Sequence, residues 1–436
     1  MLAKKLEPQA GPNPERNSGV ASQEGSAMTD HRQHLSPGQR VAWHRVRRGM
    51  SQEVLAGLIG RTEDWLSKIE NDRAALDRIS VIRALADALG ISVFDIIGDQ
   101  QVPVHGASAV QIFDIGRVRS ALTDYRQLSP LLAAVEAEPD PPPLDLLRRD
   151  LAEVMAAYQS SRYGRMLSRL PVLLTQTSLA AREHATAELR DAHRLAALAG
   201  QSAAMILTKL GETDLAWVAA QRGLAAAERT EDPAITGSLF RSVIHALQSQ
   251  GRLDDANAMT ERAAIHLRRN LNHTDPALLS IHGTLLLPGA VAAAKADDRA
   301  TADDYLAQAE QMADDLGADA NHLWTAFGPT NVRIHRVVAA MALGDVPVAL
   351  DLAPGIDTAH LPAERAVRHS LELVSAYHAR NKVDAAIEEL LAAERRAPEQ
   401  IHAHVMSRQL VLKLRATAAG RRSRILADLA RRMRLI

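Results

Sequence analysis

From residue 144 to about residue 420, one helical pattern follows another, and a short signature recurs at the breaks between them. A Gly, Asn or Asp residue tolerates a left-handed backbone, and an alanine five positions later allows two helices to pack closely. Successive signatures are 40, 46, 47 and 37 residues apart. They are Gly211 with Ala216, Gly251 with Ala256, Asp297 with Ala302, Gly344 with Ala349, and Asn381 with Ala386. Because alternating strand patterns are absent from this stretch, the recurrence predicts an all-α chain whose helices stack in pairs.

The paired pattern resembles degenerate tetratricopeptide (TPR) repeats, which stack into an α-solenoid. Its spacing exceeds the roughly 34 residues of an ideal TPR unit. An irregular helical bundle is the alternative that the pattern leaves open. In a solenoid, the first helix of each pair would line a concave face suited to a peptide or a small ligand.

Changes in composition divide the chain into four parts. Residues 1–35 are rich in Pro, Gly, Ser, Asn and Gln and lack a hydrophobic period, which predicts a disordered arm. Met28, close to the first periodic segment, is an alternative start. Residues 36–99 hold five short amphipathic patterns, residues 100–112 are predicted to be a linker, and residues 113–436 are predicted to form the TPR-like repeat domain.

The composition excludes several classes of protein. The formal net charge is −1, so a globally basic nucleic-acid-binding surface is excluded. The chain has no cysteine, which excludes disulfides, thiolate catalysis and Cys-ligated zinc. We expect no uncharged apolar window of the roughly 18 residues that span a membrane, and no secretory leader. These features predict a cytoplasmic protein without a membrane partner.

Residues 51–70 have the pattern of two short helices joined by a tight turn. Ser51 and Thr62 each precede helix-forming residues and are expected to cap the two helices. Gly60 is expected to supply the turn between them. With one helix before and two after, this is the geometry of a helix-turn-helix. The side chains expected to face inward are Leu55, Leu58, Leu66 and Ile69.

Over residues 36–99 the sequence resembles the XRE-type helix-turn-helix family of repressors. The resemblance is carried by Ser51-Gln52-Glu53-x-Leu55-Ala56, Gly60, Leu66-Ser67-x-Ile69-Glu70 and Ala84-Leu85-Ala86-x-Ala88-Leu89-Gly90-Ile91. It implies a five-helix DNA-binding domain.

The resemblance also implies which residues contact DNA. Gln52 would contact a phosphate and orient the reading helix, Thr62 would contact a phosphate, and Asn71 would contact the DNA backbone. Asp72 stands where the family usually has glycine, which predicts a slightly strained helix end. Trp65 is either a base-edge contact or a packing residue. The residues implied to face base edges are Glu63, Asp64, Trp65 and Lys68.

The charges of residues 36–99 balance, with nine Lys/Arg and nine Asp/Glu. A basic edge is nevertheless expected, with Arg47 and Arg48 as DNA contacts. Glu63 and Asp64 would repel phosphates but can accept a hydrogen bond from a cytosine amino group. A helix-turn-helix used only for protein contacts is the alternative. The basic edge comprises Arg40, Arg45, Arg47 and Arg48.

A helix-turn-helix joined to a TPR-like array resembles the peptide-pheromone receptors of Gram-positive bacteria and, more closely, actinobacterial XRE-plus-TPR regulators. A Phe-Gly-Pro-Thr-Asn-Val run recurs in the latter and stands here at 327–332. Asn331 and His335 are one helical turn apart, and Arg241 and His245 repeat that spacing. We predict that these four residues line the concave groove and contact an effector. The alternative makes Asn331 a capping residue and leaves the histidines on the surface.

The C-terminal residues 413–434 carry eight Lys or Arg against Asp428 alone. They are predicted to form a polar cap on the end of the solenoid, and contact with the DNA backbone is the alternative. The hydrophobic stripe expected in this segment is Ile425, Leu426, Leu429 and Met433.

The motifs of common enzymes and of phosphate-binding loops are absent from the sequence. We therefore expect no enzyme, no cofactor and no metal site. The sequence predicts a sequence-specific DNA-binding transcriptional regulator, a repressor, that binds a palindromic operator as a homodimer and responds to a peptide or small-molecule effector. An interaction scaffold without specific DNA binding is the alternative.

Overall fold

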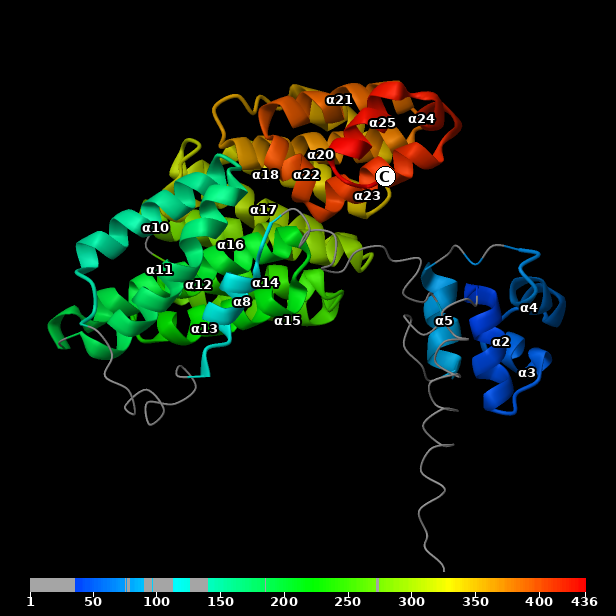
Figure 1. Cartoon of the computed structure of the whole chain (residues 1–436), viewed down its shortest axis with the longest axis horizontal. Coiled ribbons are helices and arrows are strands. Elements are labelled where there is room, and N and C mark those ends of the chain that lie inside the picture. The colour runs from blue at the N-terminus through cyan, green and yellow to red at the C-terminus, as the bar shows by residue number, and fades with distance from the viewer. Residues whose placement is uncertain are drawn as a thin grey trace, which may run out of the picture. The chain divides into compact units, whose positions relative to one another are not determined.

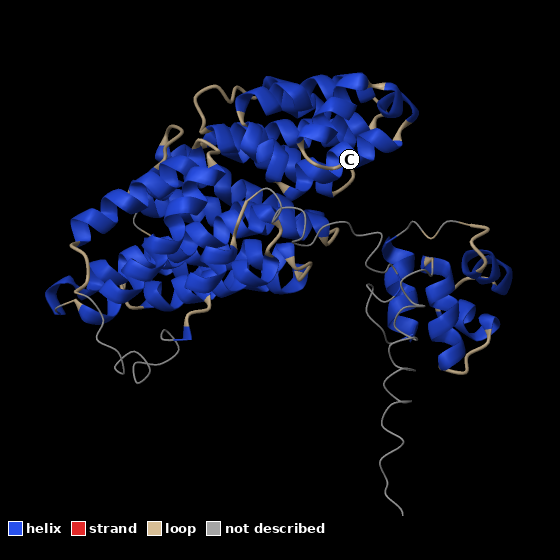
Figure 2. Ribbon diagram, viewed as in Figure 1, coloured by secondary structure: helices blue, strands red, loops and turns tan. Residues whose placement is uncertain are grey.

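The structure is a computed structural model, and it describes residues 36–74, 76, 79–89, 96, 113–125, 140–184, 186–271 and 274–436. Every regular element in these ranges is a helix, as Figure 2 shows, which confirms the all-α prediction. The chain divides into two compact units, Met1–Pro103 and Val104–Ile436, which we call the N-terminal unit and the body. The arm predicted over residues 1–35, the alternative start at Met28 and the linker predicted over residues 100–112 lie outside the described residues.

The described helices of the N-terminal unit surround a small apolar core that includes the fully buried Leu55, Leu66 and Leu85. Both predicted caps are present, since the Ser51 and Thr62 hydroxyl oxygens accept hydrogen bonds from backbone N–H groups at the starts of their helices. The fifth predicted helix lies outside the described residues, apart from the buried Ile96. The helices are α2 (Pro37–Arg47), α3 (Gln52–Leu58), α4 (Glu63–Glu70) and α5 (Ile79–Leu89).

One core prediction in this unit is wrong. Leu58 is 61% exposed, whereas Leu55, Leu66 and Ile69 are buried as expected. The buried face of the short helix α3 is set by Leu55 and Ala56. At 100° per residue, Leu58 lies about 110° from the centre of that face. A single helical spacing of three residues was therefore too little to assign its side.

The body consists of helices that pair across tight turns and stack pair upon pair (Figure 1). The first helices of neighbouring pairs, such as α14 and α16, also contact one another. This arrangement is the predicted helical-repeat fold. The helices are α8 (Gly116–Leu122), α10 (Leu144–Gln159), α11 (Tyr163–Glu183), α12 (Thr186–Leu210), α13 (Thr213–Glu228), α14 (Pro233–Ser249), α15 (Leu253–Arg269), α16 (Pro276–Lys295), α17 (Arg299–Leu316), η2 (His322–Trp324), α18 (Pro329–Ala342), α19 (Val346–Leu352), η3 (Ala353–Gly355), α20 (Ala363–Ala379), α21 (Val383–Arg396), α22 (Pro398–Ala403), α23 (Val405–Ala416), α24 (Ala418–Arg422) and α25 (Arg424–Arg432).

The recurring signature marks real turns between paired helices. All five turn residues have a left-handed backbone, with φ between +56° at Asn381 and +83° at Gly211. All five alanines that follow are fully buried. A further turn of the same kind, between α10 and α11, has Ser161 at φ +58° and the buried Met166 five residues later. The signature missed it because neither residue type matched.

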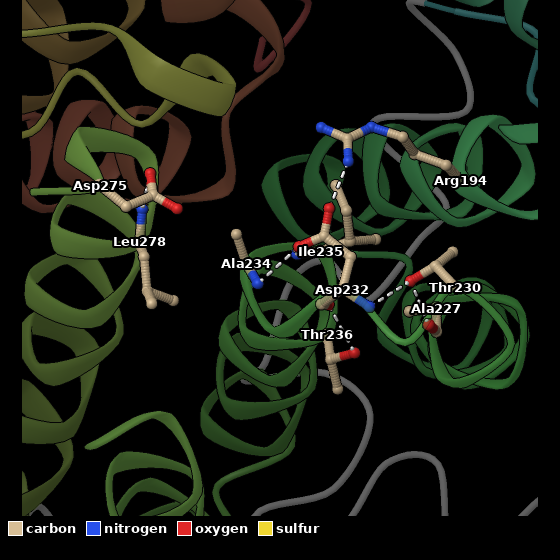
Figure 3. Close-up of polar contacts among 9 residues, drawn as sticks. All are labelled: Arg194, Ala227, Thr230, Asp232, Ala234, Ile235, Thr236, Asp275 and Leu278. Atoms are coloured by element: carbon tan, nitrogen blue, oxygen red, sulfur yellow. Dashed lines mark hydrogen bonds and ion pairs between the residues drawn. The ribbon is translucent and has the colours of Figure 1, made fainter. Parts of the chain in front are cut away.

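The starts of two first helices, α14 and α16, are each fixed by an Asp-Pro pair, whose aspartates Figure 3 shows. The Asp232 Oδ1 accepts hydrogen bonds from the N–H groups of Ala234 and Ile235 at 2.9 and 3.3 Å, and Arg194 pairs with the same carboxylate. Asp275 caps α16 in the same way, at 3.2 Å from the N–H of Leu278. Because proline suits the first helical turn, each pair sets where its helix begins and hence which side chains face inward.

The expectation that no long uncharged apolar window exists is wrong. Helix α16 is long and apolar enough to cross a membrane, with no Asp, Glu, Lys or Arg before Lys295. In the body, however, 94% of that window is buried, and α16 contacts α14, α15, α17 and α18. Its hydropathy is that of a central core helix.

The stacked pairs curve until the first of them meets the sixth pair and α22, which follows it. Helix α10 contacts α20, and α11 contacts α22. Ser161 Oγ donates to Gln400 Oε1 at 2.7 Å, and the N–H of Gly164 donates to Glu399 Oε2 at 2.7 Å. These contacts join the first pair directly to helices more than 200 residues later in the chain.

The C-terminal helices α23, α24 and α25 share a hydrophobic core with α20 and α21. Leu426, Leu429 and Met433 are buried in it as predicted, but Ile425 is 57% exposed, and its assignment to the stripe is wrong. Ile425 adjoins Leu426 on a nine-residue helix whose buried residues, Leu426, Leu429 and Ala430, lie on one face. The arginines of α24 and α25 are exposed, which gives this end of the body a polar outer face.

Candidate nucleic-acid interface and ligand cavity

The helix expected to read bases, α4, presents its charged side chains to solvent. Glu63, Asp64 and Lys68 are exposed, and Lys68 Nζ forms an ion pair with Asp64 Oδ2 at 2.6 Å. Trp65 is half-buried, packs against the core and lies beneath the Arg61 guanidinium at 5.6 Å. Trp65 therefore has a packing role, although it is only partly buried. The charged residues of α4 are placed where a DNA groove could reach them.

Gln52 forms a hydrogen bond inside the unit with Glu70, a residue for which the sequence pattern predicted no function. Gln52 Nε2 donates to Glu70 Oε2 at 2.7 Å. Arg45 donates to both oxygens of Glu70, from Nε at 2.7 Å and from Nη2 at 2.9 Å, and to the Met50 carbonyl oxygen. The Glu70 carboxylate raises the pKa of Arg45 above its usual value. The interaction joins α2, α3 and α4, and the only sequence signal for it was an acid within an apolar pattern.

This pairing corrects the predicted basic edge. Arg45 faces Glu70 and is mostly buried, so its charge is neutralised within the unit. Arg47 and Arg48 are exposed, and the Arg47 guanidinium lies over the Trp43 ring at 4.5 Å. Arg45 was grouped with its neighbours because sequence proximity does not reveal a partner 25 residues away.

The end of α4 is strained where the sequence predicted strain. Asp72 has φ +56°, and its carboxylate accepts hydrogen bonds from Ser36 Oγ at 2.6 Å and Gln39 Nε2 at 3.0 Å. Asn71 caps the helix and donates to the Ser67 carbonyl oxygen. The two bonds from α2 and its cap stabilise a conformation that aspartate adopts less readily than glycine. Asn71 and Thr62 remain exposed at the two ends of α4.

The body contains a cavity of about 530 Å³. Its walls come from the first helices of the stacked pairs, α10, α12, α14, α16, α18 and α20, together with α23 and the segment 324–326. The inner face that the sequence predicted as a concave groove therefore holds this cavity.

Three of the four predicted effector contacts lie on this cavity. Arg241, His245 and His335 line it. The placement of Asn331 is wrong, because this residue is fully buried and does not line the cavity. Its Nδ2 donates to the Ala326 carbonyl oxygen at 2.9 Å and supports the start of α18. His335 Nδ1 forms a hydrogen bond with the Asn331 carbonyl oxygen at 2.9 Å, so the two residues are joined through the backbone although only His335 lines the cavity.

The run at 327–332 builds that helix start. Phe327 is buried against Gly283, where a Cβ would lie 2.0 Å from the ring. The Asp319 carboxylate accepts from the N–H of Thr330 at 3.0 Å. Immediately before the run, Leu323, Trp324 and Ala326 all have positive φ, between +46° and +57°. Such backbone is costly for residues other than glycine, and here it holds part of the cavity wall.

The cavity is rich in positive charge. Among the described residues that line it, Glu364 is the one acidic residue, and it forms an ion pair with Lys209. Burial alone would raise the pKa of Glu364, but Lys209 and Arg365 outweigh it and bring that pKa down to about 2. Glu364 is therefore ionised and already paired. The cationic lining residues are Lys209, Arg241, Lys295, Arg365 and Arg368.

Arg241 is the most unusual of these groups. Its side chain belongs to a residue that is 4% exposed, and its Nε and Nη2 have no hydrogen-bond partner among the described residues. Burial, reinforced by the nearby Arg365, lowers the pKa of Arg241 to about 10, so it stays charged at neutral pH. The histidines beside it are neutral there, because burial and the arginines lower the pKa of His335 to about 3 and that of His245 well below its usual value. No group of three His, Asp or Glu residues in the described part of the chain is placed to hold a metal ion.

Comparison with known proteins supplies the family of the N-terminal unit. Residues 38–93 match the family model described as "Helix-turn-helix domain". These residues form a helix-turn-helix domain. The match spans α2 to α5 and includes every residue of the candidate interface from Arg47 to Asn71. Helix-turn-helix domains are a common class of duplex DNA-binding domain, so the match supports DNA binding and transcription regulation as the class of function.

Among solved structures, the chain is similar to PlcR of Bacillus thuringiensis, crystallised in complex with the peptide PapR7 and DNA. The two chains share 16% identity, with a TM-score of 0.31, and the match covers 65% of this chain and 95% of PlcR. The comparison with curated proteins finds no match.

Proposed function

We propose that the protein is a cytoplasmic, sequence-specific transcriptional repressor that binds DNA as a homodimer and whose body senses a ligand without acting on it as an enzyme. The helix-turn-helix domain carries this proposal. In it, α4 leaves Glu63, Asp64 and Lys68 exposed while its other face anchors the core. An exposed, charged reading helix on a stable three-helix support is what base recognition requires.

Base reading is tested with a binding site selected from random duplex DNA. Lys68→Ala should weaken binding to that site by about 1–3 kcal/mol and relax the preference at one base pair. Lys382→Ala, which removes an exposed lysine from the body, is the matched control and should bind as the wild type does. Uniform weakening on every sequence would place Lys68 on phosphate, and failure to select any site would refute the proposal.

The homodimer is supported by the small size of the recognition surface. One reading helix contacts only a short half-site, so useful affinity calls for two copies on a palindromic operator with half-sites about 34–36 Å apart, or a multiple of that distance. We expect light scattering at micromolar concentration to give twice the mass of the chain. A mass of 47.2 kDa under those conditions would contradict the dimer.

The alternative function, a scaffold that binds only proteins, has one observation in its favour. Val54 and Leu58 on α3 are 52% and 61% exposed and lie one turn apart. Val54→Ser with Leu58→Ser separates the two functions. It should leave selective DNA binding in place if the domain reads DNA, whereas a scaffold would lose its protein partner and show no selected DNA site.

A further inference from the structure

The charges around the cavity are not balanced within the chain. Glu364 is paired with Lys209, and Arg368 pairs with Glu372 at 2.8 Å. None of the ion pairs among the described residues involves Arg241 or Arg365. The cavity therefore holds two guanidinium groups that the chain itself does not neutralise.

Some N–H groups of the two guanidinium groups also lack a hydrogen-bond acceptor. In the described part of the chain, Nε and Nη2 of Arg241 and Nε of Arg365 are buried without a partner. A buried charge with unpaired N–H groups destabilises a folded protein strongly. Natural sequences keep such destabilising groups mainly where function uses them, so an acceptor from outside the chain is needed.

We propose that the cavity binds a small organic anion whose carboxylate or phosphate group is held by the guanidinium groups of Arg241 and Arg365. The planar, forked guanidinium matches both of these anions through paired hydrogen bonds. This inference rests on the ligand-sensing function proposed above and adds the chemistry of the ligand to it.

The remaining walls define the rest of the ligand. Trp324, Val291 and Val338 offer apolar surface, and the neutral imidazoles of His245 and His335 can each donate or accept a hydrogen bond. A volume of about 530 Å³ is within the range of small-molecule sites. The ligand is therefore an anion with an apolar or aromatic part, of metabolite size.

The probe for this inference is 8-anilinonaphthalene-1-sulfonate, paired with N-phenyl-1-naphthylamine, which has the same rings without the anionic group. Fluorescence titration of the full chain at constant ionic strength should show at least about tenfold tighter binding of the sulfonate, as expected for a charged hydrogen bond. Arg241→Met should remove this preference, and so should Arg365→Met. Arg262→Gln, on the exposed face of α15, should leave it unchanged.

The stability of the ligand-free variant distinguishes a ligand site from a structural arginine. Arg241→Met should melt at the same temperature as the wild type or higher, because it removes an uncompensated buried charge. A lower melting temperature, or equal affinity for the two probes in the wild type, would overturn the proposal. Displacement of the sulfonate by phosphate but not acetate, or the reverse, identifies the preferred anion.

Two further measurements distinguish the anion site in the body from anion binding at the DNA-contacting edge and from the proposed sensing function. Because phosphate could also bind the DNA-contacting edge, Arg47→Ala should leave sulfonate binding intact, and its loss in that variant would overturn the assignment to the body. DNA binding by Arg241→Met, measured without any anion, should equal that of the wild type.

If the anion binds but never alters DNA binding, the sensing function fails while the anion site stands. If DNA binding responds to other compounds but the sulfonate preference is absent, the anion site fails alone.

Discussion

Two buried arginines, one in each unit, show opposite ways of keeping a charge inside a protein. Arg45 in the helix-turn-helix domain donates to both oxygens of Glu70 and to the Met50 carbonyl oxygen. Arg241 in the body has neither an ion pair nor, at Nε and Nη2, a hydrogen bond within the described residues. Burial affects both groups, yet the pKa of Arg45 is raised by Glu70 while that of Arg241 is lowered to about 10 by burial and by Arg365.

The difference indicates that the Arg45 interactions stabilise the fold, whereas Arg241 has N–H groups that lack a partner among the described residues and are free to bind a ligand. A closed network fixes geometry, and removing one member exposes the others as unpaired buried groups. An incomplete network, such as that of Arg241, contains unpaired donors, and a ligand that accepts hydrogen bonds from them gains binding free energy. The two arginines should therefore respond in opposite ways when their surroundings are changed.

The largest expected effect is at the closed network. Glu70→Ala leaves Arg45 buried without its carboxylate and frees Gln52, which should cost about 3–5 kcal/mol of stability in the helix-turn-helix domain. Hydrogen exchange of the amides in α2, α3 and α4 would report this loss locally. Glu53→Ala removes an exposed acid from α3 and is the matched control. Unchanged protection in Glu70→Ala would mean that the network is not structural.

An intermediate effect is expected when the pH is lowered, namely a loss of stability in the body. The unfolded chain protonates a histidine near pH 6.5, whereas the pKa of His335 in the folded body is about 3. Between these two pKa values the histidine is protonated in the unfolded chain but not in the folded body. The free energy of unfolding therefore falls as the pH drops below about 6.5. From His335 alone the loss is about 2 kcal/mol between pH 6.5 and 5. The lowered pKa values of His245 and His404 act in the same direction.

This pH dependence is measured as the urea midpoint of the body at pH 7 and pH 5. His335→Gln should reduce the difference between the two midpoints, since glutamine does not titrate. An identical difference in the variant and the wild type would show that His335 is protonated in the folded body.

The smallest effect is expected at the surface of the reading helix. The Lys68–Asp64 pair is 53% and 75% exposed at its two side chains, and such pairs contribute about 0–1 kcal/mol. Asp64→Asn should therefore shift the urea midpoint of the helix-turn-helix domain very little. A loss comparable to that of Glu70→Ala would mean that the charges of α4 serve the fold, which would weaken their assignment to DNA.

Much of the helix-turn-helix domain could be predicted because its signals are local. Ser51, Gly60 and Thr62 act on backbone groups within a few residues, so their positions alone fix the helix ends. The turns of the body are local in the same sense, and a left-handed residue followed by a buried alanine identified five of them. Leu58 and Ile425 were misplaced because an exposed apolar side chain leaves the same pattern as a buried one.

The tertiary structure alone decided which charges meet. Glu70 reaches Arg45 across 25 residues, and Ser161 donates a hydrogen bond to Gln400 across 239 residues. Asn331 and His335 are four residues apart, yet one lies in a helix junction and the other lines the cavity. Local sequence determines where helices begin and end because capping and turn geometry act over single turns. It does not determine the curvature of the stacked pairs, which depends on packing summed over the whole body. That curvature places Arg241 and Arg365, which form no ion pair among the described residues, on the same cavity.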